Sequence, residues 1–287
     1  MMERIEMVVK GRRKILQKDV PGRSNREIRM WTLESKPGST VEYLERAYLG
    51  ALSAVDLAEN FGRQLAADAR YTDQGRQDQF KDHVLHQTVP VFHQGRRTIS
   101  RAKQELADMR SRLQLPKADS ADAAGAIARM EIRTWLRGLP QSERDKITIA
   151  DDIDPQLRAA ILEAPAMLTG VAQAHLNLLK EKALRELHGS LIDDIAELSA
   201  AIEMAASAVE AGRDSARLDT GLTAEQFDAA ARPIEQRQSV AWLRRRNGET
   251  RVVDLERRVE RGATADELAT GIEATTHDEF LAKRDAA

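Results

Sequence analysis

The sequence predicts an all-α protein with a small extended or β-like arm at its N-terminus. Three observations lead to this prediction: apolar residues recur at helical spacing over long stretches, the residues between these stretches match helix caps and stops, and the core must be aliphatic. Hydrophobic residues make up 42% of the 287-residue chain, but aromatic residues only 4%. We expect a basic arm (1–36), a helical hairpin (37–115), short helices followed by one long helix (116–219), and a short-helix tail (220–287).

Charge and cysteine content exclude several classes of function. The 44 basic and 46 acidic side chains leave a net charge of −2, so no global field draws the chain to nucleic acid or lipid. The chain has no cysteine, which excludes disulfides, thiolate catalysis and cysteine-bound metals. The N-terminus lacks the apolar core of a signal peptide. The longest uncharged run, between Glu163 and Lys180, is shorter than about 18 residues, so we expect no membrane span.

Residues 1–36 differ from the rest of the chain in being basic and rich in short apolar runs. The runs at 5–9 and 27–33 are separated by the turn dipeptide Pro21-Gly22, which indicates two short strands or an extended arm. The arm could bind nucleic-acid phosphates without reading bases, dock on an acidic neighbouring subunit, or stay solvated. The candidate phosphate or partner contacts are Lys10, Arg12, Arg13, Lys14 and Lys18.

A long helix is expected to begin after the turn at Pro37-Gly38. Its apolar positions step by three and four residues, which is the period of a coiled-coil seam. The seam consists of Leu44, Ala47, Ala51, Ala54, Ala58, Phe61 and Leu65. Its alanines allow close approach of a partner helix. Further apolar residues widen this face toward a second neighbour, namely Tyr48, Leu52, Val55 and Leu57.

The stretch RYTDQG (70–75) breaks the first helix, and Thr72 is the expected cap of the second. The second helix runs to about Leu113 and carries an apolar residue at every seventh position. These seam residues are Leu85, Phe92, Ile99, Leu106 and Leu113. The short connection between two long seams predicts an antiparallel hairpin, and Pro90 should kink or divide its second helix.

Short helices are expected between residues 116 and 170. Ser120 is the expected cap of the first, Gly138-Leu139-Pro140 its stop, and Asp154-Pro155 the start of another. The compact stretch AILEAPAMLTG (160–170) is interpreted as a joint, in which AILEAP closes one helix and AMLTG opens the long one. That helix should run to about Gly212 and bend near Gly189.

The tail from residue 220 is predicted to be a series of short capped helices. Three hydroxyl residues start capping boxes: Thr223 with Gln226, Thr264 with Glu267, and Thr276 with Glu279. Asn247-Gly248 and Gly262 are interpreted as stops. The basic cluster WLRRRNG (242–248) is interpreted as cations at a helix C-terminus.

No catalytic signature is present, and we expect neither enzymatic activity nor a cofactor. His83, His86 and His93 are the best metal candidates, but Pro90 distorts their face and no HExxH motif occurs. The acidic clusters Asp151-Asp152 with Asp154, and Asp193-Asp194, are attributed to capping and to a solvated helix face. Glycine-rich phosphate loops and nucleophile elbows are also missing from the sequence.

Two stretches carry a family resemblance. DARYTDQGRQDQF (68–80) joins two long helices, and LRGLPQSERDKITIADDIDPQLRAAILEAPAMLTG (136–170) follows a pattern of short helices with an acidic turn. Both resemble helical proteins encoded in the late, virion-structural regions of tailed phages and prophages. The region from the start of the first stretch to the end of the second is about a third of the chain. The resemblance therefore implies no catalytic residues at any position of this chain.

The resemblance implies a non-enzymatic structural or assembly component of a phage particle, acting through helix contacts with itself and with other virion proteins. It implies residence in the host cytoplasm during assembly and then in the virion. The alternative is a nucleic-acid-binding accessory protein that uses the basic arm. A histidine-metal enzyme is a third and weaker hypothesis.

Overall fold

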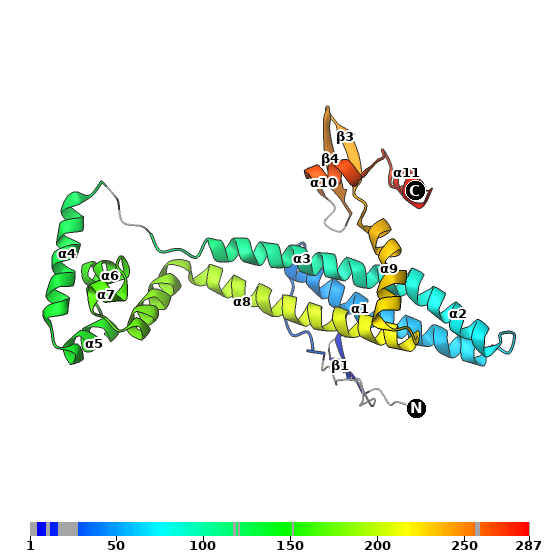
Figure 1. The fold of residues 1–287 in the computed structure, drawn as a ribbon, viewed down its shortest axis with the longest axis horizontal. Helices are drawn as coiled ribbons and strands as arrows, with labels where there is room; N and C mark the ends of the chain where they lie inside the picture. Colours follow the sequence, from blue (N-terminus) through cyan, green and yellow to red (C-terminus); the bar gives the residue numbers. More distant parts are fainter. Residues whose placement is uncertain are drawn as a thin grey trace. The chain divides into compact units, whose positions relative to one another are not determined.

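The computed structural model describes residues 5–9, 12–16, 28–116, 119, 121–150, 152–255 and 259–286 (Figure 1). The chain forms two compact units. The first combines Met1–Glu105 with Glu197–Ala287, and the second is Leu106–Ala196. Most of the described chain is helical, and a four-stranded sheet lies near its C-terminus.

The first unit begins with the predicted hairpin. Its helices are α1 (Thr40–Ala67), α2 (Asp73–His83), the π-helical turn η1 (Val84–Thr88) and α3 (Val89–Ser111). The Ser39 hydroxyl accepts from the backbone N–H of Glu42 at 3.2 Å and caps α1. The Thr72 hydroxyl accepts from the N–H of Gly75 at 3.1 Å, which confirms Thr72 as the cap of α2.

The predicted seams largely match the buried faces of these helices. In α1, Leu44, Ala51, Ala54, Ala58 and Leu65 are buried, and Ala47 and Phe61 are partly buried. Tyr48, Leu52 and Val55 are buried as expected, but the expectation for Leu57 is wrong, because its exposed fraction is 63%. In the second helix Phe92, Ile99 and Leu106 are buried, whereas Leu85 and Leu113 are only partly buried.

The kink expected at Pro90 takes the form of the π-helical turn η1. Proline lacks an N–H, and its ring clashes with the carbonyl four residues back, which here belongs to His86. A wider turn just before Pro90 relieves this clash and adds a residue to the helix. The extra residue changes the buried face, so Val84 and Val89 enter the core and Leu85 turns partly away.

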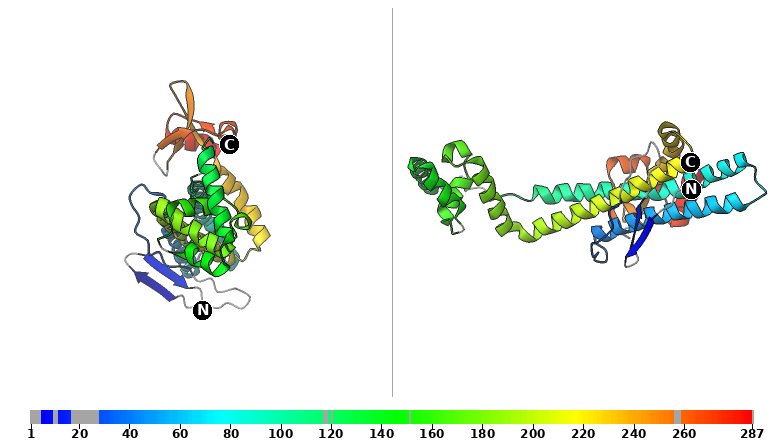
Figure 2. Two further views of the ribbon diagram at one scale, coloured as in Figure 1. Left: turned by 90° about the vertical axis from the view of Figure 1, so that its left-hand side faces the viewer. Right: turned by 90° about the horizontal axis from the view of Figure 1, so that it is seen from below.

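The long helix is α8 (Gln173–Asp219), which extends past the predicted end at Gly212. His188 inside it has φ −131° and ψ 28°, values that do not belong to a helix. The predicted bend near Gly189 is therefore confirmed, one residue earlier. The half of α8 that belongs to the first unit lies alongside α1 and α3 (Figures 1 and 2).

Two glycines set how closely these three helices pack. A Cβ added to Gly95 of α3 would lie 2.8 Å from Cγ2 of Val209 on α8. A Cβ added to Gly212 of α8 would lie 2.7 Å from Cε1 of Phe92 and 3.3 Å from Cγ2 of Val55. The hairpin and the end of α8 therefore share one core.

The tail of the first unit contains both helices and strands. The elements are α9 (Ala224–Ser239), β3 (Trp242–Arg246), β4 (Glu249–Asp254), β5 (Val259–Gly262), α10 (Ala265–Thr270), β6 (Ile272–Glu273) and α11 (His277–Ala286). The sheet has the order β5-β4-β3-β6, in which only β3 and β6 pair in parallel. The capping boxes at Thr223 and Thr264 are confirmed. At the third site, Glu279 accepts from the N–H of Thr275 rather than from that of Thr276.

The prediction that residues 242–248 end a helix is wrong. Asn247 and Gly248 have φ values of 51° and 84°, and they form the tight turn between the antiparallel strands β3 and β4. Asn-Gly favours this hairpin turn because both residues tolerate positive φ. The three arginines before it lie in β3, and Gly262 ends β5 instead of stopping a helix.

The N-terminal arm is only partly as predicted. β1 (Ile5–Val9) pairs in antiparallel fashion with β2 (Arg12–Leu16), and the described part of the second predicted run, 28–33, is not a strand. Ile28 and Trp31 are instead buried, and the rings of Trp31 and Tyr48 lie 5.6 Å apart. The end of the arm therefore belongs to the core. Lys10 and Lys18 lie outside the described residues, as do the side chains of Arg12, Arg13 and Lys14.

The second unit contains α4 (Ala123–Gly138), α5 (Gln141–Ile149), α6 (Pro155–Leu162), α7 (Ala166–Thr169) and the first part of α8. Its core consists of Leu136, Leu157, Ile161, Val171, Leu176 and Leu179. Asp122 caps α4 by accepting from the N–H of Gly125 at 2.8 Å, and the predicted cap, Ser120, lies outside the described residues. Asp154 caps α6 as expected.

The stretch 160–170 is a joint, but it opens a single turn rather than the long helix. AMLT forms α7, and Gly170 closes it with a positive φ of 70°. The guanidinium of Arg144 covers this glycine, since a Cβ there would lie 2.5 Å from Nη1. Only after this turn does α8 begin, at Gln173.

Candidate functional site: an arginine-lined cavity

A cavity of about 180 Å³ lies in the first unit, between α3 and the C-terminal sheet with α11. Its wall combines cationic, acidic and aromatic side chains from segments far apart in the sequence. The charged members are Arg97 and Arg101 of α3, Asp254 of β4, Arg261 of β5, Glu267 of α10 and Arg284 of α11.

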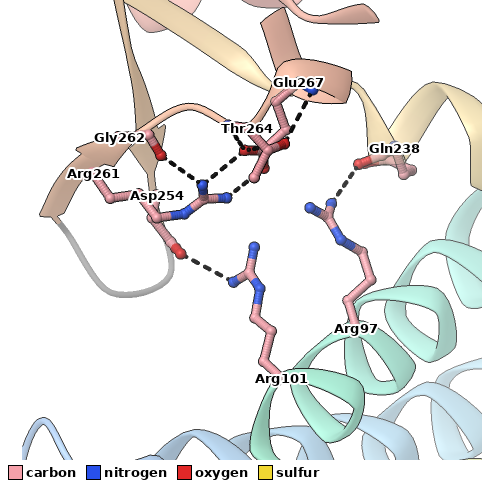
Figure 3. Close-up of polar contacts among 8 residues, drawn as sticks. All are labelled: Arg97, Arg101, Gln238, Asp254, Arg261, Gly262, Thr264 and Glu267. Atoms are coloured by element: carbon pink, nitrogen blue, oxygen red, sulfur yellow. Dashed lines mark hydrogen bonds and ion pairs between the residues drawn. The ribbon is translucent and has the colours of Figure 1, made fainter. Parts of the chain in front are cut away.

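Arg97 and Arg101 lie one helical turn apart, so both extend from α3 toward the sheet (Figure 3). Nη1 of Arg97 donates to the carbonyl of Gln238 at 3.0 Å. Nη1 of Arg101 lies 3.0 Å from Oδ2 of Asp254. These contacts connect α3 to the end of α9 and to the end of β4.

Asp254 needs this cation because it is buried, with an exposed fraction of 7%. A buried carboxylate is costly unless it is paired and hydrogen-bonded. Arg101 supplies a counter-charge from another element. We therefore expect this pair to hold the C-terminal sheet against α3.

Arg261 and Glu267 form a second ion pair, in which two guanidinium nitrogens contact two carboxylate oxygens. The contact from Nη1 measures 2.8 Å, and the same nitrogen donates to the carbonyl of Gly262 at 3.0 Å. The hydrogen bond from Arg261 lowers the pKa of Glu267 to about 2. Glu267 also accepts from the N–H of Thr264, so one carboxylate both caps α10 and orients Arg261 (Figure 3).

One wall of the cavity is aromatic. The Trp242 and Phe280 rings are stacked with centroids 5.8 Å apart, and His277 lies 5.5 Å from Trp242. Nε1 of Trp242 donates to the carbonyl of Ala274 at 2.8 Å, which fixes the indole beside β6. His93 of α3 lines the cavity too. Burial lowers its pKa, and its Nε2 lies 2.8 Å from Oγ of Ser239.

The lining is more cationic than acidic. It contains four arginines and two carboxylates, and one of the arginines, Arg284, pairs with Asp285 at 2.9 Å outside the lining. Guanidinium groups stay protonated, so they do not exchange protons in catalysis or attack substrates. The arginines therefore pair with anionic groups, as Arg101 does with Asp254 and Arg261 with Glu267.

The three histidines singled out as metal candidates do not come together at this cavity. His83 stacks on Phe61 with centroids 4.0 Å apart, and His86 lies 3.0 Å from Asp82. Only His93 reaches the cavity. In the part of the chain that the structure describes, no three histidine or acidic side chains form a metal-binding group.

The acidic clusters behave as capping and surface charges. Asp154 caps α6, and Asp193 pairs with Arg185 at 2.9 Å on an exposed face. Asp151 lies outside the described residues.

Sequence reasoning missed the cavity arginines. The one local signal is the spacing of Arg97 and Arg101, which share a helix face. Their partners lie about 140–150 residues later: Gln238 is at the end of α9, and Asp254 is on a strand that was expected to be a helix. The cavity could not be predicted from the sequence, because the strands of the tail that form part of its wall were expected to be helices.

Comparisons with protein-family models, with curated proteins and with solved structures found no match. Among the described residues, no helix is long and apolar enough to cross a membrane.

Proposed function

We propose that this protein is a non-enzymatic structural or assembly component of a tailed phage particle, working in the host cytoplasm and then in the virion. It acts by packing helices against further copies of itself or against other virion proteins. The resemblance of residues 68–80 and 136–170 supports the phage assignment. The apolar surface of the second unit supports the mode of action.

The observation that carries this proposal is the exposed apolar face of α4. Ile127, Met130 and Trp135 have exposed fractions of 56%, 55% and 53%. Small residues surround them, because Ala124 and Ala128 are exposed on the same helix. Large exposed apolar groups that gather on one face are typical of protein–protein contacts, and tryptophan is frequent among residues that dominate such contacts.

The one-turn helix α7 of the same unit also exposes apolar side chains. Met167 and Leu168 are both exposed there. A flexible methionine adapts to partners of different shape. The joint at 160–170 therefore contributes side chains to the core of the second unit and also exposes apolar side chains.

The test uses the full chain and a double variant, Ile127→Ser with Trp135→Ser. Both residues are exposed, so circular dichroism and the unfolding midpoint should change little. Incorporation of the variant into particles, measured by immunoblot of purified virions after complementation, should fall strongly. The matched control is Leu57→Ser, an exposed apolar residue of α1 in the other unit. Normal incorporation of the double variant would refute the role of this face.

A second candidate function is nucleic-acid binding through the arm. The observation in its favour is that Arg12, Arg13 and Lys14 follow one another within the strand β2. If they contact phosphates, replacing all three with glutamine should reduce the slope of log affinity against log salt by about 2.7 on duplex DNA. An unchanged slope would refute this function.

A further inference from the structure

We propose that Asn247 is a site of spontaneous self-modification, at which attack by the backbone nitrogen of Gly248 converts the side-chain amide to aspartate and isoaspartate. This inference goes beyond the proposed particle role, because it assigns a covalent change to a turn of the C-terminal sheet and requires no partner. Three features of the turn support it: the residue pair itself, the exposure of both residues, and their position outside the β-ladder.

The first feature is the residue pair. The chain has asparagine at positions 25, 60, 177 and 247, and only Asn247 is followed by glycine. The reaction brings the nitrogen of the following residue to Cγ of the asparagine, and a bulky side chain on that residue obstructs the approach. Glycine has no Cβ. A Cβ built on Gly248 would meet no atom within 4 Å beyond its chain neighbours, so the approach to this nitrogen is open.

The second feature is the exposure of the reacting groups. Asn247 and Gly248 are both exposed. Among the residues that the structure describes, none is hydrogen-bonded to the Asn247 side chain. The amide can therefore rotate toward the backbone without losing a contact within the protein. Water, which the reaction consumes, reaches both residues.

The third feature is the position of the pair outside the β-ladder. β3 and β4 are paired from Leu243 with Val252 to Arg246 with Glu249 (Figure 1), so the ladder ends on either side of the two turn residues. The rotation that brings the Gly248 nitrogen toward the side chain therefore involves residues outside the ladder. Inside a helix, by contrast, the N–H of the next residue is bonded to the carbonyl four residues back.

The reaction consumes only water. Hydroxide removes the amide proton of Gly248, and the nitrogen forms a bond to Cγ of Asn247. The bond from Cγ to Nδ2 then breaks, and the former amide group takes a proton from water and leaves as ammonia. Water next hydrolyses the succinimide ring. Cleavage of the new bond to Cγ gives aspartate, whereas cleavage of the original peptide bond gives isoaspartate.

The two products should affect the hairpin differently. Aspartate tolerates positive φ much as asparagine does. Isoaspartate instead leads the backbone through the side chain and adds a methylene group to the turn. Because turn type and loop length fix the register of a hairpin, the longer turn no longer matches the pairing of Arg246 with Glu249. Isoaspartate should therefore loosen this end of the β3–β4 hairpin, and aspartate should not.

The experiment is incubation of the folded full-length protein at mildly alkaline pH, followed by peptide mapping with a fragmentation method that distinguishes isoaspartate from aspartate. The chain supplies matched controls, because Asn60 of α1 and Asn177 of α8 are exposed like Asn247 but lie inside helices. Conversion at Asn247 should be faster than at either control by about tenfold or more, which corresponds to a barrier difference of about 1.4 kcal/mol. Equal rates at the three sites, or conversion of Asn247 only in urea-unfolded protein, would overturn the proposal.

A second measurement tests the effect on the hairpin. Hydrogen exchange across β3 and β4 should become faster in incubated protein in proportion to its isoaspartate content. The control variant is Asn247→Gly, which removes the reactive amide and keeps a residue that the turn accepts. Its exchange should not change on incubation. Exchange that does not follow isoaspartate content in the unmodified sequence, or that rises equally in Asn247→Gly, would overturn the loosening.

Discussion

Replacing Gly212 with alanine should destabilise the first unit, although alanine is the better helix former. In an exposed helix the change would stabilise by about 1 kcal/mol. Here the new Cβ would lie 2.7 Å from Cε1 of Phe92, a fully buried ring, so the core must rearrange to accommodate it. Overpacking a core costs about 1–3 kcal/mol, so the net loss should reach up to about 2 kcal/mol.

The assay is urea or thermal unfolding followed by tryptophan fluorescence. Trp31 and Trp242 are buried in the first unit, whereas Trp135 lies in the second. A Trp135→Phe background therefore restricts the signal to the unit being tested. For a unit of this size, 1 kcal/mol shifts the midpoint by about 2–4 °C.

The control is Gly50→Ala in α1 of the same unit. A Cβ at Gly50 would lie 3.6 Å from Cγ1 of Val91, an ordinary van der Waals contact, so this change should be neutral or stabilising. In a Phe92→Leu background, Gly212→Ala should cost less, because the clashing ring is gone. A stabilising Gly212→Ala would refute the close packing of α8 against α3.

Three further predictions concern single positions. Gly170→Ala should destabilise the second unit by about 1–2 kcal/mol or more in urea unfolding, because alanine is strained at φ 70° and its Cβ would displace Arg144. Asn247→Val should speed hydrogen exchange across the β3–β4 hairpin, since a β-branched residue resists the positive φ of the turn. Glu267 has a pKa of about 2, lowered from 4.5 chiefly by Arg261, so it stabilises the fold above about pH 4.5 and loses this effect as pH falls toward 2. Glu267→Gln should flatten the pH dependence of Tm over that range, and an unchanged dependence would show that the pair contributes nothing.

The helices could be predicted where a regular spacing of apolar residues is bounded by a recognisable capping residue. The seam of α1 ends at the turn before Thr72, and both features follow from local residue types. The bend at His188 and the distortion before Pro90 also follow from single residues, although the π-helical turn itself does not. A π-turn depends on how the extra residue packs, and the sequence pattern carries no sign of that.

The C-terminal sheet was not predicted because the sequence there carries signals both for and against β-strands. Asn247-Gly248 is a strong hairpin signal, but three arginines precede it and Val252 and Val253 form only a short apolar run. The cavity depends on contacts such as Arg101 with Asp254, which join residues 153 positions apart. Pairing over that distance is decided by tertiary packing, which local propensity does not specify.

The most direct test of the proposed particle role is mass spectrometry of purified virions and of assembly intermediates from a lysate of the source strain. We expect peptides of this chain in particles or in intermediates, at a fixed ratio to the major structural proteins. Absence of the chain from both, while it is abundant in the same cells, would contradict the proposed particle role.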